Sequence, residues 1–106
     1  MSYRFMRVIV MFDLPTTTSA DLKEYRKFRR FLIKSGFIMQ QESVYSKLAL
    51  NSSAVEAITS NIRKNKPPTG NVQLLTITER QYSSIELIVG NRESEIIDSD
   101  ERLVIL

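Results

Sequence analysis

The sequence predicts an α+β fold in which helices cover one face of an antiparallel sheet. Apolar runs rich in β-branched residues alternate with two stretches whose apolar residues recur every three to four positions. With 106 residues, of which 42% are hydrophobic, the chain has the size and composition of one domain with a modest core. No apolar run approaches the roughly 18 residues that a membrane helix requires, so we expect a cytoplasmic protein with no membrane partner.

The first strand is expected over residues 7–13 and ends at Asp13. Its interior, from Val8 to Phe12, is an unbroken apolar run that is stopped by Pro15, which is typical of a central strand buried on both faces. A strand end at the edge of a core holds a side chain rigidly beside a loop that leaves room for a ligand. Asp is also a common turn residue, so Asp13 is either a functional acid or a turn starter.

The first helix is expected to begin among four possible N-cap residues, 16–19. Asp21 follows Thr18 by three positions, where an acid complements the helix dipole, and Gly36 suits the helix end. The spacing of the apolar residues predicts one buried helix face. That face consists of Leu22, Tyr25, Phe28, Phe31 and Leu32.

A second strand region, 37–50, contains a Gln-Gln-Glu patch that predicts a bulge or a bend. After it, Ser53 and Glu56 have the spacing of a capping box, which predicts a second helix that begins there and ends near 63–64. The apolar stripe of this short helix consists of Val55, Ile58 and Ile62.

The remaining segments follow from local composition. Residues 65–71 contain two prolines and a glycine and are expected to form a loop. Residues 72–78 and 85–89 are expected to be strands. An acidic, polar linker is expected over 91–102, followed by a very short apolar strand, 103–106, which must pair with something or fray.

If the region 37–50 divides into two strands, the element order is β-α-β-β-α-β, the ferredoxin-like arrangement; the alternative is β-α-β-α-β-β with short extra strands. One face of a ferredoxin-like sheet stays open. Because the first strand is apolar on both faces, we expect a second copy to cover that face. We therefore divide the chain into a ferredoxin-like domain, 1–90, and a linker with a C-terminal strand that packs on the dimer partner, 91–106.

The composition excludes several kinds of catalytic site. There is no His and no Cys, which rules out Ser-His-Asp catalysis, Cys-His catalysis and the usual zinc sites. The three glycines are far apart, so no Gly-rich phosphate loop exists. Carboxylate chemistry with Mg²⁺ or Mn²⁺ remains. One carboxylate does not make such a site, but a two-fold axis would bring Asp13 beside its copy, where the pair could share a cation or a proton.

Positive charge is concentrated in the first part of the chain. Residues 1–70 carry a net charge of +7, and residues 71–106 carry a net charge of −4. A line of basic residues at helical spacing follows the first helix, where it suits a nucleic-acid phosphate backbone but is also typical of a solvated helix face. The line consists of Lys23, Lys27, Arg30 and Lys34, with Arg26 and Arg29 beside it, and a second basic cluster consists of Arg63, Lys64 and Lys66.

Three features of the sequence occur in a specific order. The run 6–15 reads Met-Arg-Val-Ile-Val-Met-Phe-Asp-Leu-Pro, the basic helix ends in Lys-Ser-Gly-Phe over 34–37, and residues 41–45 read Gln-Glu-Ser-Val-Tyr. In this order and spacing they resemble the CRISPR-associated Cas2 family, the small partner of the CRISPR integrase. The resemblance covers roughly the whole chain and looks closest to members from systems with a single large RNA-guided effector nuclease.

The resemblance implies a ferredoxin-like homodimer whose C-terminal strands pack on the partner. It implies an adaptor in spacer acquisition that lies between two dimers of the CRISPR integrase and holds the incoming double-stranded DNA at a fixed length. Family members are also described as metal-dependent nucleases on RNA or DNA. The first-strand aspartate that binds the metal in those members corresponds to Asp13.

Two positions depart from the family pattern. Phe12 stands where many members have a tyrosine, and residues 15–18 stand where many have an arginine-rich helix start. Both changes remove polar groups that a phosphodiester cleavage site uses to hold developing charge. The sequence therefore favours a DNA-binding adaptor, with a metal-dependent endonuclease at Asp13 as the first alternative. A small-molecule regulatory module, a role that ferredoxin-like folds often have, is the second alternative and would leave the basic helix unexplained.

Overall fold

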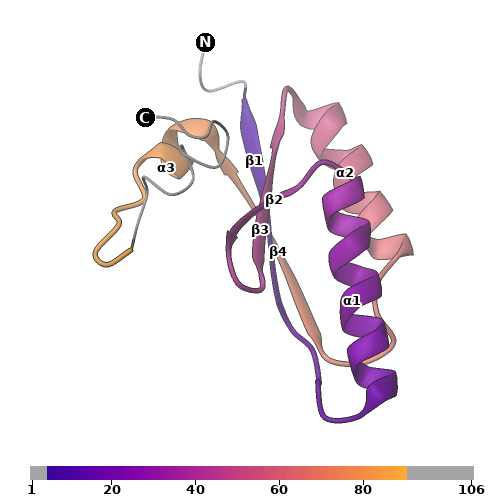
Figure 1. Ribbon diagram of the computed structural model, residues 1–106. Helices are drawn as coiled ribbons and strands as arrows, with labels where there is room; N and C mark the ends of the chain where they lie inside the picture. Colours follow the sequence, from indigo (N-terminus) through magenta and orange to yellow (C-terminus); the bar gives the residue numbers. More distant parts are fainter. Residues whose placement is uncertain (1–4, 91–106) are drawn as a thin grey trace.

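Figure 1 shows the computed structural model of the chain, which describes residues 5–90. The elements in chain order are β1 (Met6–Asp13), α1 (Ser19–Lys34), β2 (Ile38–Gln41), β3 (Val44–Ala49), α2 (Ser52–Lys64), β4 (Asn71–Thr78) and α3 (Glu79–Ser83). The strands form one sheet in the order β2-β3-β1-β4, and each neighbouring pair is antiparallel. The predicted β-α-β-β-α-β order and the ferredoxin-like α+β fold are therefore confirmed.

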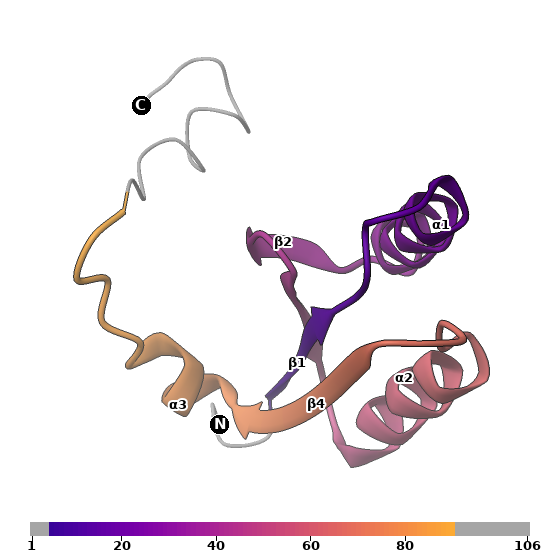
Figure 2. The ribbon, with the colours of Figure 1, turned by 90° about the horizontal axis from the view of Figure 1, so that it is seen from below.

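The helices divide between the two faces of the sheet. Helices α1 and α2 lie over one face, which we call the helix face, whereas α3 lies on the other side, which we call the open face (Figure 2). Strand β1 is central, because it pairs with β3 along one edge and with β4 along the other. Within residues 5–90, no helix combines the length and the apolar character needed to cross a bilayer.

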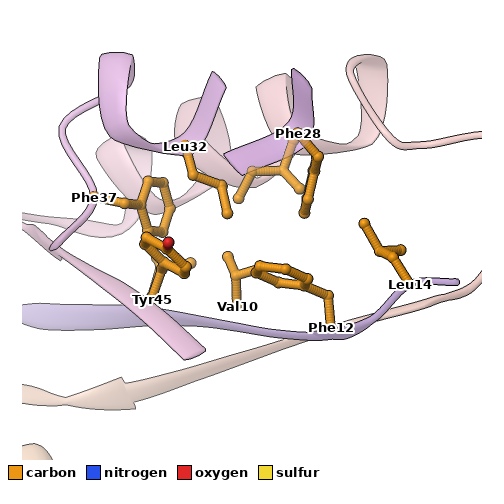
Figure 3. Close-up of a cluster of buried hydrophobic side chains, with 9 residues drawn as sticks. Val10, Phe12, Leu14, Phe28, Leu32, Phe37 and Tyr45 are labelled. Atoms are coloured by element: carbon orange, nitrogen blue, oxygen red, sulfur yellow. The ribbon is translucent and has the colours of Figure 1, made fainter. Parts of the chain in front are cut away.

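The hydrophobic core lies between the helix face and the helices above it, mainly α1 (Figure 3), with Ile62 contributed by α2. Val8, Val10 and Phe12 alternate along β1 toward this core, where they meet Phe28 and Leu32 of α1. These five side chains are between 0% and 6% exposed. Burial of side chains of this size contributes roughly 1.5–3 kcal/mol each, so the packing of α1 on the sheet is a main source of stability.

Both ends of α1 follow from its sequence. Thr18 is the N-cap, and its hydroxyl accepts a hydrogen bond from the Asp21 N–H (3.0 Å) while the Asp21 carboxylate accepts one from the Thr18 N–H (3.2 Å). At the other end, Gly36 has a φ of +95°. The N–H groups of Gly36 and Phe37 donate to the carbonyls of Ile33 and Leu32, which is the Schellman arrangement.

The second strand region divides at the Gln-Gln-Glu patch. Strand β2 ends at Gln41 and β3 begins at Val44, and the pairing register shifts between Met39 and Gln41. Ser43, in the turn, has a positive φ of 68°. The predicted irregularity is thus present, and it coincides with a hairpin that produces two strands.

The start of α2 differs from the prediction. Asn51, not Ser53, is the N-cap, and its side chain accepts a hydrogen bond from the Ala54 N–H at 2.8 Å. Ser53 and Glu56 are exposed residues inside the helix. The spacing of a capping box does not reveal which residue has the extended backbone of a cap, and Asn caps a helix as well as Ser does. The end of α2 at Lys64 agrees with the prediction.

The strand predicted over residues 85–89 is absent. Thr78 instead starts α3, because its hydroxyl accepts a hydrogen bond from the Gln81 N–H and the Gln81 side chain accepts one from the Thr78 N–H. Among the described residues, 85–90 belong to no strand, and Ile88 and Val89 are 77% and 89% exposed. The linker predicted over 91–102 and the strand predicted over 103–106 lie outside the described residues, so the division of the chain at residue 90 stays a prediction.

Candidate functional site

Asp13 is the last residue of β1 and is exposed. Its neighbours hold it in place: the ring of Phe12 contacts Phe28 edge-on at 5.2 Å between centroids, and Leu14 is 8% exposed. Because side chains alternate along a strand, the buried Phe12 places Asp13 on the open face of the sheet. The side chain at position 12 therefore lies on the core side, away from the carboxylate that follows it.

The loop before β4 packs closely on this strand end. Gly70 has a φ of +91°, and a Cβ at this position would lie 2.8 Å from the Asp13 carbonyl oxygen and 2.7 Å from a methyl carbon of Leu14. Only glycine combines this backbone conformation with such a close approach. Gly70 therefore contributes to the position of Asp13 without offering any functional group.

Asn71 is a candidate site residue that the sequence did not indicate. It lies directly opposite Asp13 in the antiparallel pairing of β1 with β4. Residues paired in this way have Cβ atoms about 4.5–5.5 Å apart on the same face, so an amide side chain stands beside the carboxylate. A strand register would have found this neighbour, but the register between segments that are far apart in the chain cannot be read from one sequence.

The donors at this strand end fit a divalent cation in part. Mg²⁺ takes oxygen ligands and is usually held by one or two carboxylates together with waters and substrate phosphates. Asp13 supplies one carboxylate and Asn71 lies beside it, but within the described part of the chain no group of three or more acidic side chains, the only possible His/Cys/Asp/Glu ligands here, is placed to hold a metal. The residues present therefore fit a site that a second copy or a bound phosphate completes.

The predicted basic line lies on the solvent side of α1. The buried residues of this helix, Phe28 and Leu32, face the sheet. All members of the line are exposed, and in residues 5–90 none of them has a carboxylate within 4.0 Å, since the two ion pairs found there are Arg7–Glu79 and Arg63–Glu56. The exposed basic residues of α1 are Lys23, Arg26, Lys27, Arg29, Arg30 and Lys34.

The structure does not gather these cations around Asp13. The basic line belongs to α1, which covers the helix face, whereas Asp13 is the last residue of β1 and lies on the open face. Figure 1 shows β1 leading into α1. The second cluster, Arg63, Lys64 and Lys66, lies at the end of α2 and in the loop that leads to Gly70. The two candidate sites are thus separate: a line of free cations on one layer, and a single carboxylate at the strand end.

Comparison with known proteins identifies the family. The family described as CRISPR associated protein Cas2 matches residues 6–85. A protein from Treponema denticola named CRISPR-associated endoribonuclease Cas2 is 55% identical over 101 residues, which cover 95% of this chain and 100% of that protein. Relatives of the same name from Streptococcus mutans serotype c (strain ATCC 700610 / UA159) and Lacticaseibacillus rhamnosus are 52% and 44% identical, and the alignments cover 95% of this chain and 93% and 100% of theirs.

A solved structure agrees with the fold. The structure described as the crystal structure of cas2 matches with a TM-score of 0.55, covering 83% of this chain and 88% of that one, at 17% sequence identity. At this identity the match bears on the fold alone, which it supports. The family match and the relatives, which extend over most of the chain, carry the assignment: this chain belongs to the Cas2 family of CRISPR-associated proteins.

Proposed function

We propose that this chain is a dimeric DNA-binding adaptor for CRISPR spacer acquisition, which bridges dimers of the CRISPR integrase and holds the incoming duplex. The observation that carries the DNA-binding part is the line of exposed cations on α1 that have no acidic partner among the described residues. Membership in the Cas2 family supports the setting in spacer acquisition. The bridging of integrase dimers rests on the resemblance to that family alone.

A phosphate backbone is the natural partner for such a line. Lysine and arginine side chains on one helix face neutralise phosphates and release the counterions condensed on the duplex, without reading base sequence. This suits an adaptor that accepts fragments of any sequence. A small-molecule regulatory role gives no account of these cations.

The open face supports the dimeric part of the proposal. Ile38, Leu48 and Leu75 lie on this face and are 56%, 41% and 46% exposed in the single chain. Apolar side chains grouped on one face of a sheet are typical of a surface that another molecule covers. In a two-fold arrangement the same face of a second copy covers it.

The salt dependence of duplex binding tests the role of α1. Neutralisation of one phosphate-contacting residue, as in Lys27→Gln, is expected to weaken binding and to reduce the slope of log affinity against log salt by about 0.9. Arg80→Gln is the matched control, because Arg80 is exposed but lies on α3 at the other side of the sheet. If the combined variant of Lys23, Lys27, Arg30 and Lys34 keeps the wild-type slope, α1 is not the binding surface.

A metal-dependent endoribonuclease that uses Asp13 is the second candidate. The names of the relatives favour it, and Asp13 is exposed at a rigidly held strand end. Asp13 of each copy and the neighbouring Asn71 are the residues that would hold Mg²⁺ or Mn²⁺. When bound, such a cation supplies positive charge for the phosphodiester oxygens, while Gly70 and Phe12 keep the carboxylate in position.

One substitution separates the two candidates. Asp13→Asn keeps the shape of the side chain and removes its charge, so it is expected to abolish metal-dependent RNA cleavage if Asp13 holds the cation. The same variant is then assayed for integration of a short duplex by the cognate integrase. Integration at the wild-type level by a cleavage-deficient variant supports the adaptor. Loss of integration by a variant that is still dimeric would show that Asp13 acts in the process itself.

A further inference from the structure

Arg7 makes a two-point ion pair on the open face. Its Nε donates to Oε1 of Glu79 at 2.9 Å, and its Nη2 donates to Oε2 at 2.6 Å. The two side chains are only 13% and 29% exposed. A bidentate arginine–carboxylate pair fixes orientation as well as distance, so it holds the first residue of α3 against the second residue of β1.

Tyr82 extends this contact into a network. The guanidinium carbon of Arg7 lies 4.1 Å from the centre of the Tyr82 ring, which is a cation–π geometry. The Tyr82 hydroxyl contacts Oε1 of Gln40, and the same oxygen accepts a hydrogen bond from the hydroxyl of Ser46 at 2.5 Å. Ser46 is fully buried. The network therefore ties α3 to three strands at once: β1, β2 and β3.

Helix α3 depends on this network for its position. It has five residues, none of them buried, and a helix of this length is not stable on its own in water. The backbone adds one further tie, from the Glu79 N–H to the carbonyl of Phe5 at 2.8 Å. Since no residue of α3 is buried, polar contacts hold the point at which the chain leaves the sheet.

The segment that follows α3 is apolar and exposed. Ile85 and Leu87 line a hollow of about 520 Å³ on the open face, together with Ile9 and Val44 of the sheet. The next residues, Ile88 and Val89, are far more exposed. One surface thus carries both an apolar hollow and protruding apolar side chains, which is what a self-complementary interface between two identical chains requires.

We propose that the Arg7–Glu79–Tyr82 network is a latch that sets the position of residues 85–89 and thereby the affinity of the homodimer. The inference rests on the homodimer of the proposed function and adds the residues that prepare its interface. Arg7, Glu79 and Tyr82 act as positioning residues through the segment that follows α3. The occupant of the apolar surface is a second copy of this chain.

Arg7→Met is the main test, because methionine keeps an apolar stem of similar reach and loses both the ion pair and the cation–π contact. Charge-assisted bonds of this kind are worth enough to weaken the dimer roughly tenfold to a hundredfold when they are lost. Arg7→Lys keeps the charge but not the two-point geometry, and an intermediate dissociation constant is expected. Arg80→Met, a neighbouring exposed arginine on α3, is the matched control and should leave dimerisation unchanged.

Sedimentation velocity over a range of concentrations measures the dissociation constant, and hydrogen exchange at a concentration where all variants are monomeric measures the latch itself. In Arg7→Met the amides of 79–89 are expected to exchange faster, with the amides of β1 and β3 unchanged. If Arg7→Met fails to fold, Glu79→Gln, which keeps the size of the side chain, takes its place. A dimer as tight as wild type in these variants would overturn the latch. A wild-type chain that stays monomeric would instead overturn the homodimer of the proposed function, and the latch with it.

Discussion

The two faces of the sheet carry similar apolar strand residues but meet different surroundings. On the helix face, Val8 and Val10 are fully buried in the core cluster to which α1 and α2 both contribute. On the open face, Leu48 and Leu75 come from strands that flank the same β1 and are 41% and 46% exposed. Both faces thus carry apolar strand residues, and they differ in what covers those residues.

The two faces of the sheet therefore have different roles, one in folding and one in association. The helix face gives the single chain its stability, because its core is complete within residues 5–90. The open face keeps apolar surface that the single chain covers only in part, by a short helix held through polar contacts. Changes on the helix face should therefore act on folding, whereas changes on the open face should act on association.

The largest expected effect lies on the helix face. Phe12→Ala removes a ring that contacts Phe28 and Tyr25 edge-on and stacks on Tyr45. Truncation of a buried phenylalanine costs about 3–5 kcal/mol of unfolding free energy. Chemical denaturation followed by circular dichroism measures this loss. A cost below 1 kcal/mol would mean that the helix face is not the core of the chain.

The next effect concerns the strand end where the two faces meet. Gly70→Ala combines a positive φ with a Cβ that would lie 2.8 Å from the Asp13 carbonyl oxygen, so we expect a loss of about 2–3 kcal/mol. Gly36→Ala is the matched control, because its φ is similar (+95°) but its Cβ would meet only the end of the Lys47 side chain. The control should lose about 1 kcal/mol. If Gly70→Ala and Gly36→Ala lose equal unfolding free energy in the same denaturation, the close packing of Gly70 on Asp13 does not contribute to stability.

The sequence predicted those features that depend on neighbours in the chain. The apolar run of β1 and the three-to-four spacing in α1 follow from local periodicity, and so does Asp13 at the strand end. The exposed basic line follows from the same period, since residues opposite a buried stripe face solvent. For these features no knowledge of tertiary contacts was needed.

The features that the sequence missed depend on contacts between distant segments or on competition between neighbouring signals along the chain. Asn71 lies beside Asp13 only through the register of β1 with β4, and Arg7 meets Glu79 across 72 positions of the chain. Residues 85–89 have the composition of a strand. The capping box of Thr78 and Gln81 starts a helix before them, and the segment then finds no sheet edge within the described residues.

A smaller effect concerns the N-terminal cap of α2. Asn51→Ala removes the side chain that caps α2, and a lost N-cap costs about 1 kcal/mol. Ser53→Ala should change the unfolding free energy by less than about 0.5 kcal/mol, because Ser53 is an exposed residue inside the helix. Thermal and chemical unfolding of the two variants decide between the observed cap and the capping box that the sequence suggested. The reverse order of effects would restore Ser53 as the cap.

The smallest effect on folding is expected on the open face. Leu75→Ser should change the unfolding free energy of the monomer by less than about 0.5 kcal/mol, because Leu75 is already 46% exposed. If a second copy covers this face, the same variant should weaken the dimer about tenfold, since the remaining apolar surface of Leu75 is then buried on association. Gln73→Ser, on the same strand and the same face, is a control that removes no apolar side chain and should leave the dimer intact. A Leu75→Ser chain that loses stability as a monomer and dimerises normally would show that the open face belongs to the fold of the single chain, and the contrast between the two faces would no longer hold.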